Sequence, residues 1–284
     1  MGRARVRIGI TAPGGRITPE TAERARATAA GLYPDGRVEL VFHPQCFAAH
    51  GHFAGDDDLR AAALIETAND PSLDAVWFAR GGYGACRVAE TVVAGLDEAA
   101  RSKIWLGYSD AGSMLAALYR AGFAGLAHGP MVQDLCREGG EAAFARALAW
   151  LVDRDRSALE PGLRPGQKAA TFNITILSQL LGTPLQPELS DHVLILEEVS
   201  EHMYRIDRAL FHITSNPDIR RVAGIRLGRC SLIPPNEPDF GQDEEAVARY
   251  WCERSGIPWL GRADVGHDVD NRVAPFGTVT LDAT

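Results

Sequence analysis

The sequence lacks the long apolar runs, the paired cysteines and the basic excess that mark several classes of protein. No stretch approaches the roughly 20 apolar residues that a membrane-spanning helix needs. The basic N-terminus is followed by too short an apolar run for a signal peptide. Its 29 Lys and Arg against 37 Asp and Glu give a net charge of −8, whereas a general nucleic-acid binder presents a basic face. We therefore expect a cytoplasmic protein that binds neither nucleic acid nor a membrane.

Metal-binding and disulfide patterns are also missing. The five cysteines are an odd number, lie far apart and contain no CxxC, which favours reduced thiols over a disulfide framework or a zinc site. His50 and His52 lie close together, but no further histidines or carboxylates surround them at the spacing of metal ligands. A solvated loop explains this pair better, and the sequence predicts no metal site.

What the 284 residues do contain is an alternation of apolar strands and helical patterns in the first half. Strands are expected at 6–12, 38–43, 74–79 and 103–107. Such alternation predicts an α/β fold with a parallel, doubly wound sheet.

The pattern changes after residue 151. Residues 152–168 are charged, contain Pro and Gly and show no periodicity, which is typical of a linker. Beyond it, strands are expected at 191–199, 220–228, 258–261 and 277–282, with helices chiefly at 174–181, 204–215 and 243–255. We therefore predict two domains, residues 1–151 and a more β-rich domain of residues 169–284.

The stretch LGYSDAGSM, residues 106–114, places Ser109 where an apolar strand gives way to a helix. In doubly wound sheets, ligands bind at the corners that follow the carboxyl ends of strands. A tight turn there would project the hydroxyl as a nucleophile, but the match to G-x-S-x-G is incomplete because residue 111 is Ala. A serine that caps the following helix is the alternative, and these residues alone favour it.

Three further features of the sequence could contribute to ligand binding or catalysis. The stretch ARGGYGACR, residues 79–87, has three glycines in four positions, which would let the backbone approach a ligand closely. His267 lies in a polar, glycine-bearing loop, and a histidine base needs an orienting acid. Glu197 and Glu198 end an apolar strand and point to opposite faces, so one of them could supply it. A flexible turn, a loop histidine and a solvated strand end are the structural alternatives.

Taken in order along the chain, these motifs resemble the LD-carboxypeptidase family of serine peptidases, which includes muramoyltetrapeptide carboxypeptidases and microcin C self-immunity peptidases. The stretches that carry the resemblance are AGDDDLRAAAL, ARGGYGACR, LGYSDAGSML, HGPM, LLGTP, LILEEVSEHMYRIDRAL, VAGIRLG and GHDVDNRVAPFG. The resemblance implies a flavodoxin-like N-terminal domain, a smaller β-rich C-terminal domain and a homodimer.

The resemblance also implies the catalytic residues. Ser109 matches the nucleophile, Glu197 the first acid of L-E-[DE] and His267 the histidine of the last G-H motif. No metal and no cofactor are implied.

The same resemblance and the residue types suggest groups around the substrate. The backbone N–H of Asp110 and one from Gly81 or Gly82 would receive the oxyanion. A free carboxylate would suit Arg80, Arg87, Arg205 or Arg208. For Arg205 and Arg208, a solvated helix face or a salt bridge to Glu198 or Glu201 is favoured over a substrate contact. Asn173 is kept where relatives have Gly-Gly-Asn, but the glycines are absent, so the pocket is expected to differ there.

The expected activity is removal of the terminal D-alanine from murein tetrapeptides in cell-wall recycling. A microcin C-type peptidase that hydrolyses a peptide–nucleotide amide is the alternative, but residues 230–245 offer only Phe240 to stack on a base. An inactive module that binds cell-wall peptides is a third reading, which the intact triad disfavours.

Overall fold

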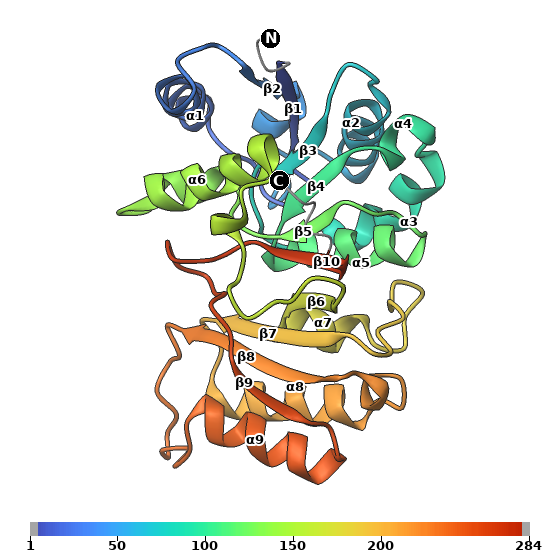
Figure 1. Ribbon diagram of the computed structural model, residues 1–284, viewed down its shortest axis with the longest axis vertical. Helices are drawn as coiled ribbons and strands as arrows, with labels where there is room; N and C mark the ends of the chain where they lie inside the picture. The colour runs from blue at the N-terminus through green and yellow to red at the C-terminus, as the bar shows by residue number, and fades with distance from the viewer. Residues whose placement is uncertain (1–4, 280–284) are drawn as a thin grey trace.

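A ten-stranded sheet runs the length of the molecule in the order β2-β1-β3-β4-β5-β10-β6-β7-β8-β9 (Figure 1). The computed structural model describes residues 5–279. Every neighbouring pair of strands is parallel except the two that contain β10, which runs antiparallel to both β5 and β6. The other nine strands therefore all point the same way, and their carboxyl ends share one edge.

The first half of the chain builds the strands β2 to β5. Its elements are β1 (Val6–Thr11), α1 (Pro19–Leu32), β2 (Val38–Phe42), α2 (Asp57–Asn69), β3 (Ala75–Phe78), α3 (Ala85–Gly95), α4 (Glu98–Arg101), β4 (Ile104–Gly107), α5 (Gly112–Arg120), β5 (Leu126–His128) and α6 (Gly140–Leu148). The four strands expected here from the sequence are confirmed. The Thr18 hydroxyl caps helix α1 by accepting from the N–H of Thr21, and Pro19 is the first helical residue.

The second half contributes the remaining strands and three helices. Its elements are β6 (Lys168–Asn173), α7 (Ile174–Leu180), β7 (Val193–Val199), α8 (Met203–Ser215), β8 (Gly224–Ser231), α9 (Glu244–Ser255), β9 (Trp259–Arg262) and β10 (Ala274–Thr278). The three expected helices are confirmed. The strand expected at 277–282 lies earlier, at 274–278, and residues 280–282 lie outside the described residues.

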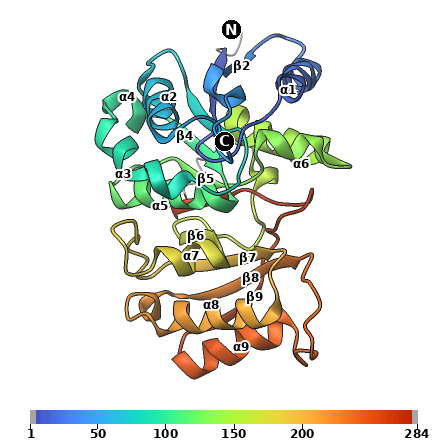
Figure 2. The same ribbon diagram turned by 180° about the vertical axis from the view of Figure 1, so that it is seen from behind.

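Helices cover the sheet unequally in its two halves. In the first half, α1 and α6 contact each other on one face, while α2, α3 and α5 pack in series on the other. That second layer continues through α7 and α8 to α9, which lie in front of their strands in Figure 2. One hydrophobic core follows this layer across both halves, from Ala61 to Phe276. The two halves thus share a core as well as a sheet.

Residues 152–168, expected to form a linker, contact both halves of the chain. Asp153 accepts hydrogen bonds of 2.8 and 3.2 Å from Arg37 of the first half. Glu160 is buried within this stretch and receives two hydrogen bonds from Arg226, of 2.6 and 2.8 Å. The division of the chain into two domains at these residues stays a prediction.

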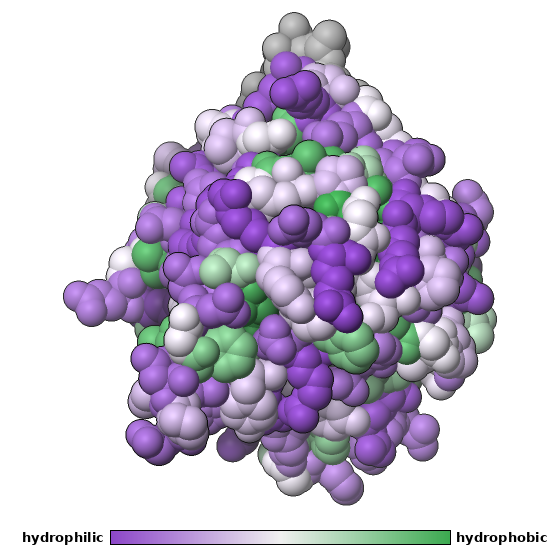
Figure 3. All heavy atoms as spheres, turned by 90° about the horizontal axis from the view of Figure 1, so that it is seen from below, coloured by the Kyte–Doolittle hydropathy of each residue, from purple (hydrophilic) through white to green (hydrophobic). Residues whose placement is uncertain are grey.

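The α9 end of the molecule is mostly hydrophilic, with apolar side chains in separate small patches (Figure 3). Among residues 5–279, no helix is both long and apolar enough to cross a bilayer.

Candidate active site

The shared edge of the sheet brings together residues that are distant in sequence. Ser109 lies two residues after the end of β4, and Glu197 lies near the carboxyl end of β7. His267 belongs to the loop between β9 and β10. Its Nδ1 is hydrogen-bonded to Oε2 of Glu197, 70 positions away in the chain. The glutamate is fully buried and the histidine is 8% exposed, so the sequence-predicted acid and base form one buried pair.

Strand pairing is irregular beside this acid. Leu196 pairs with Leu227, but Glu198 pairs with Cys230, so β8 has one more residue than β7 over this interval. Gly228 lies in the extra segment, and a Cβ added there would come within 3.1 Å of the Glu197 Cβ. Irregularities of this kind commonly re-aim side chains next to active sites.

Ser109 occupies a strained corner. Its φ is +60°, a left-handed conformation that costs a non-glycine residue free energy. It opens the short 3-10 helix η2 (Ser109–Ala111), and neither η2 nor α5 has a side-chain cap. The alternative in which this serine caps a helix is therefore wrong. A strained strand-to-helix turn that presents a serine is the geometry of a nucleophile elbow.

The corner is tied to a neighbouring helix by Asp110. Its carboxylate accepts a 2.8 Å hydrogen bond from the N–H of Ala85, the first residue of α3. Burial raises the pKa of this carboxyl to about 6, against the lowering effect of hydrogen bonds from Ala85 and Gly84. The side chain of Asp110 thus stabilises the turn. Its backbone N–H is the group predicted to donate to the oxyanion.

The glycine-rich loop lies against the serine. A Cβ added to Gly81 would lie 3.2 Å from the Ser109 Oγ, so bare backbone faces the hydroxyl. The carbonyl of Gly81 accepts a 3.1 Å hydrogen bond from the N–H of Gly15. A Cβ on Gly14 would lie 2.0 Å from the Gly82 carbonyl, so these two loops pack backbone against backbone. Gly81 therefore lies beside the predicted nucleophile, whereas the nearest neighbours of Gly82 belong to Gly15.

Electrostatics favour a protonatable base. Burial opposes the charged form of His267, but the charge and the hydrogen bond of Glu197 outweigh it and raise the pKa of the imidazole above its usual value. Its Nε2 has no hydrogen-bond partner within residues 5–279, so it is not bonded to Ser109 in this structure. Catalytic hydrogen bonds are often long without substrate and tighten when it binds. The free Nε2 is the atom that a base would use.

The second glutamate has a different task. Glu198 accepts hydrogen bonds from the Asn173 amide (2.6 Å), from the N–H and hydroxyl of Thr175 (2.9 and 2.8 Å) and from the N–H of Val199 (2.9 Å). Asn173 also accepts from the N–H of Ile176 and so caps α7. Both ends of this amide are therefore occupied, and its predicted contact with substrate stays a prediction.

The four arginines considered for a substrate carboxylate are scattered. The exposed Arg80 donates to the carbonyl of Arg16, and Arg87 pairs with Asp57. Arg205 pairs with Glu201, while Arg208 lies over the ring of Tyr204.

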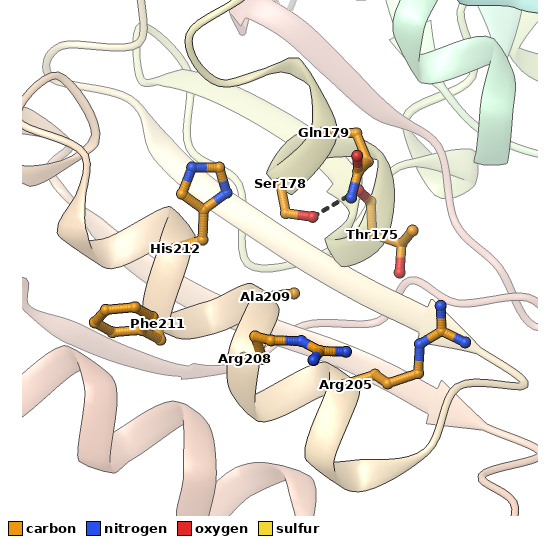
Figure 4. A pocket seen from close by; sticks show the side chains of 8 residues that line it. All are labelled: Thr175, Ser178, Gln179, Arg205, Arg208, Ala209, Phe211 and His212. Atoms are coloured by element: carbon orange, nitrogen blue, oxygen red, sulfur yellow. Dashed lines mark hydrogen bonds between the residues drawn. The ribbon is translucent and has the colours of Figure 1, made fainter.

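Two of these arginines share a cavity. Arg205 and Arg208 line a hollow of about 370 Å³ between α7 and α8, together with Thr175 and Ser178 (Figure 4). No contact found among the described residues joins any of the four arginines to Ser109, Glu197 or His267.

Sequence reasoning missed several groups that surround His267, the predicted base. The ring of Tyr108 lies 4.7 Å from that of His267, and Arg137 donates a hydrogen bond to the His267 carbonyl. His128 is fully buried beside Tyr108, with its pKa lowered to about 4 by burial. Arg137 has no local signal, because its contact spans 130 residues. Within the described part of the chain, no group of three or more His, Cys, Asp or Glu could hold a metal ion.

Comparison with known proteins gives a consistent result for both halves of the chain. Residues 8–129 match a family model described as the LD-carboxypeptidase N-terminal domain, and residues 170–281 match the LD-carboxypeptidase C-terminal domain. The murein tetrapeptide carboxypeptidase of Pseudomonas aeruginosa is 27% identical, covering 97% of this chain and 92% of its own. A Streptomyces coelicolor protein, whose assignment as a carboxypeptidase is itself provisional, is 32% identical, covering 98% and 90%.

Solved structures share the fold. The muramoyltetrapeptide carboxypeptidase from Oxalobacter formigenes has a TM-score of 0.79 at 24% identity and covers 96% of this chain and 93% of its own. The microcin C7 self-immunity protein MccF, in complex with glutamyl sulfamoyl guanosine, has a TM-score of 0.79 at 18% identity, covering 97% and 92%. At these identities the likeness establishes the α/β fold alone.

Proposed function

The chain belongs to the LD-carboxypeptidase family, and from this we propose that it is a serine peptidase that removes the terminal D-alanine from murein tetrapeptides in cell-wall recycling. The observation that carries the proposal is the buried His267–Glu197 pair, whose histidine ring packs on Tyr108, the residue just before the strained Ser109. A nucleophile, a base and an orienting acid are the parts that acyl transfer from a peptide requires.

In the proposed mechanism, the Ser109 hydroxyl attacks the carbonyl of the L,D-peptide bond while Nε2 of His267 takes its proton. Glu197 holds the N–H at Nδ1 and stabilises the imidazolium. The imidazolium then protonates the nitrogen of the departing D-alanine as the C–N bond breaks. Water attacks the resulting ester and gives a proton to His267, which passes that proton to the Ser109 oxygen as the ester C–O bond breaks and the shortened peptide leaves. The backbone N–H groups of Asp110 and Gly81 receive the oxyanion, where losing one donor typically costs about 2.7–4 kcal/mol of barrier.

The second candidate function is hydrolysis of a peptide–nucleotide amide. What supports it is a fold shared with MccF. What weighs against it is the loop at 230–245, where Phe240 is the single aromatic residue and is only partly buried against the core. A catalytically inactive peptide-binding module is the third candidate, and the complete set of catalytic residue types argues against it.

One assay with four peptides separates these candidates. A site for a free terminal carboxylate and a D-residue should cut the tetrapeptide that ends in D-alanine, because attack needs the carbonyl within about 3–3.5 Å of the hydroxyl. It should spare the pentapeptide ending in D-alanyl–D-alanine, the tetrapeptide with terminal L-alanine and the amidated tetrapeptide. Products are resolved by mass. If the amidated peptide or the pentapeptide were cut as fast as the free tetrapeptide, hydrolysis of a peptide–nucleotide amide or of a broader range of amides would become the first candidate.

The proposal includes a cytoplasmic homodimer, which rests on the family resemblance. Analytical ultracentrifugation of the purified chain should give a mass near twice its 30.6 kDa. A monomer at micromolar concentration would remove this part and leave the proposed chemistry unchanged.

A further inference from the structure

The loop that carries the base is held by the other half of the molecule. Arg137 follows the short helix η3 (Val132–Cys136) of the first half, and its Nη1 donates a 2.7 Å hydrogen bond to the backbone carbonyl of His267. Glu197, by contrast, belongs to the second half and fixes the imidazole through its side chain. His267 is therefore held by two hydrogen bonds. Glu197 of the second half binds its ring, and Arg137 of the first half binds its backbone carbonyl.

A buried aspartate sets the geometry of this grip. Asp134 is 4% exposed, and its Oδ1 accepts from the Tyr108 hydroxyl at 2.8 Å and from Nε of Arg137 at 2.9 Å. Its Oδ2 accepts from the N–H of Met131 at 2.8 Å, so the carboxylate is anchored on both oxygens. The fully buried ring of Tyr108 packs on the ring of His267. One carboxylate therefore orients both a residue next to Ser109 and the arginine that holds the base.

We propose that Arg137, oriented by Asp134, is a positioning residue that fixes His267 relative to Ser109. The inference rests on the proposed function. Glu197 sets the tautomer and the direction of the imidazole through its ring, whereas Arg137 holds the backbone of the same residue from the half that carries Ser109. The chain of contacts from Tyr108 through Asp134 and Arg137 crosses that boundary. A displacement of about 1 Å in such a site can cost about 10²-fold in rate.

A matched arginine provides the control. Arg146 on α6 also belongs to the first half and also donates through Nη1 to carbonyls of the same loop, those of Val269 (3.0 Å) and Asn271 (2.8 Å). It supports the loop without touching the histidine. Comparing Arg137→Ala with Arg146→Ala therefore separates support of the loop from placement of the base.

The experiment measures kcat and KM on the murein tetrapeptide and the melting temperature of both variants. Arg137→Ala should lower kcat by about 10²-fold with KM within twofold, because Arg137 acts through the base and leaves substrate binding unchanged. Its side chain is 41% exposed, so added guanidinium can reach the gap and should restore part of kcat. Arg146→Ala should lower the melting temperature at least as much, keep most of its kcat and show no rescue.

Three results would overturn the inference. Equal losses of kcat in the two variants without rescue would make Arg137 a structural support only. A raised KM at unchanged kcat would make it a substrate-binding group. A near-wild-type kcat in a folded Arg137→Ala would remove it altogether. In each case the wild-type chain cleaves the tetrapeptide and Ser109→Ala does not, whereas failure of the proposed function would appear as no cleavage by the wild type.

Discussion

The two parts of the candidate site are held in place by different means. The corner at Ser109 is defined by backbone conformation. Ser109 has a φ of +60°, and the main chain of Gly81 faces its hydroxyl. The His267–Glu197 pair is a side-chain construction, in which a buried carboxylate and an arginine each hold one end of the histidine. The proposed nucleophile should therefore respond to changes of backbone preference, and the proposed base to changes of hydrogen-bonding groups.

The largest expected effect comes from replacing the serine in two ways. Ser109→Ala and Ser109→Gly should both lower kcat by about 10⁶-fold, because each removes the attacking oxygen. They should differ in stability, with the glycine variant more stable by about 1 kcal/mol, because glycine adopts a φ of +60° without steric cost. Turnover assays and urea unfolding measure the two effects.

The pair of variants tests the backbone side of the comparison. If alanine and glycine gave the same free energy of unfolding, the corner would not be strained in solution. Turnover near the wild-type rate in either variant would remove Ser109 as the nucleophile.

The next largest effect concerns the two adjacent glutamates. Glu197→Gln should lower kcat by about 10⁴-fold with little change in fold, because the amide no longer selects the tautomer or stabilises the imidazolium. Glu198→Gln should keep turnover within tenfold and instead lower the free energy of unfolding by about 1–3 kcal/mol, because several hydrogen bonds to Asn173 and Thr175 depend on its charge. Steady-state kinetics and denaturant unfolding of both variants measure the contrast. The reverse pattern would exchange the roles of the two residues.

The smallest expected effect is a shift in pH dependence. The proposed base must be neutral in the free enzyme, and its pKa is raised, so kcat/KM should rise with pH through an acid limb above about 6.5. Weakening the charge partner with Glu197→Gln should move this limb to lower pH in the residual activity.

One control variant sharpens that measurement. Asp110, whose pKa burial raises to about 6, also titrates in this range, so Asp110→Asn should leave the limb of His267 in place. Because the folded-state pKa of His267 is raised, its contribution to stability is complete below about pH 6.5 and is lost as pH rises through the raised value. A limb unmoved by Glu197→Gln would mean that another group controls the rate.

Much of the fold around Ser109 and Glu197 could be predicted from the sequence, because short stretches of sequence carry the signals for these elements. The strands β3 and β4 are continuous apolar runs, and the end of β4 places Ser109 correctly. The alternation of side chains in β7 predicts that Glu197 and Glu198 face opposite ways, although only the tertiary contacts show which one meets the histidine.

The missed elements are those without a local signature. Strand β5 has three residues, and β6 reads KAATFN without alternation because all but its first residue are buried. Strand β10 is paired on both sides with strands far away in the chain, so its position is set by tertiary packing. The sequence gives no signal for Arg137 either, since its contact with the candidate site is a carbonyl 130 positions later, while Asp134 lies three positions before it.

The central place of β10 has a consequence for how the chain assembles during synthesis. Strand β10 joins β5 to β6 in the sheet, and both of these strands leave the ribosome roughly a hundred or more residues before it does. Until β10 arrives, the facing edges of two partial sheets stay open, and open edges invite pairing with other chains. The loop that carries His267 also precedes β10 directly, so neither the sheet nor the base is fixed before translation of these last strands. Slowed translation or early release near this point would therefore yield two aggregation-prone, inactive halves.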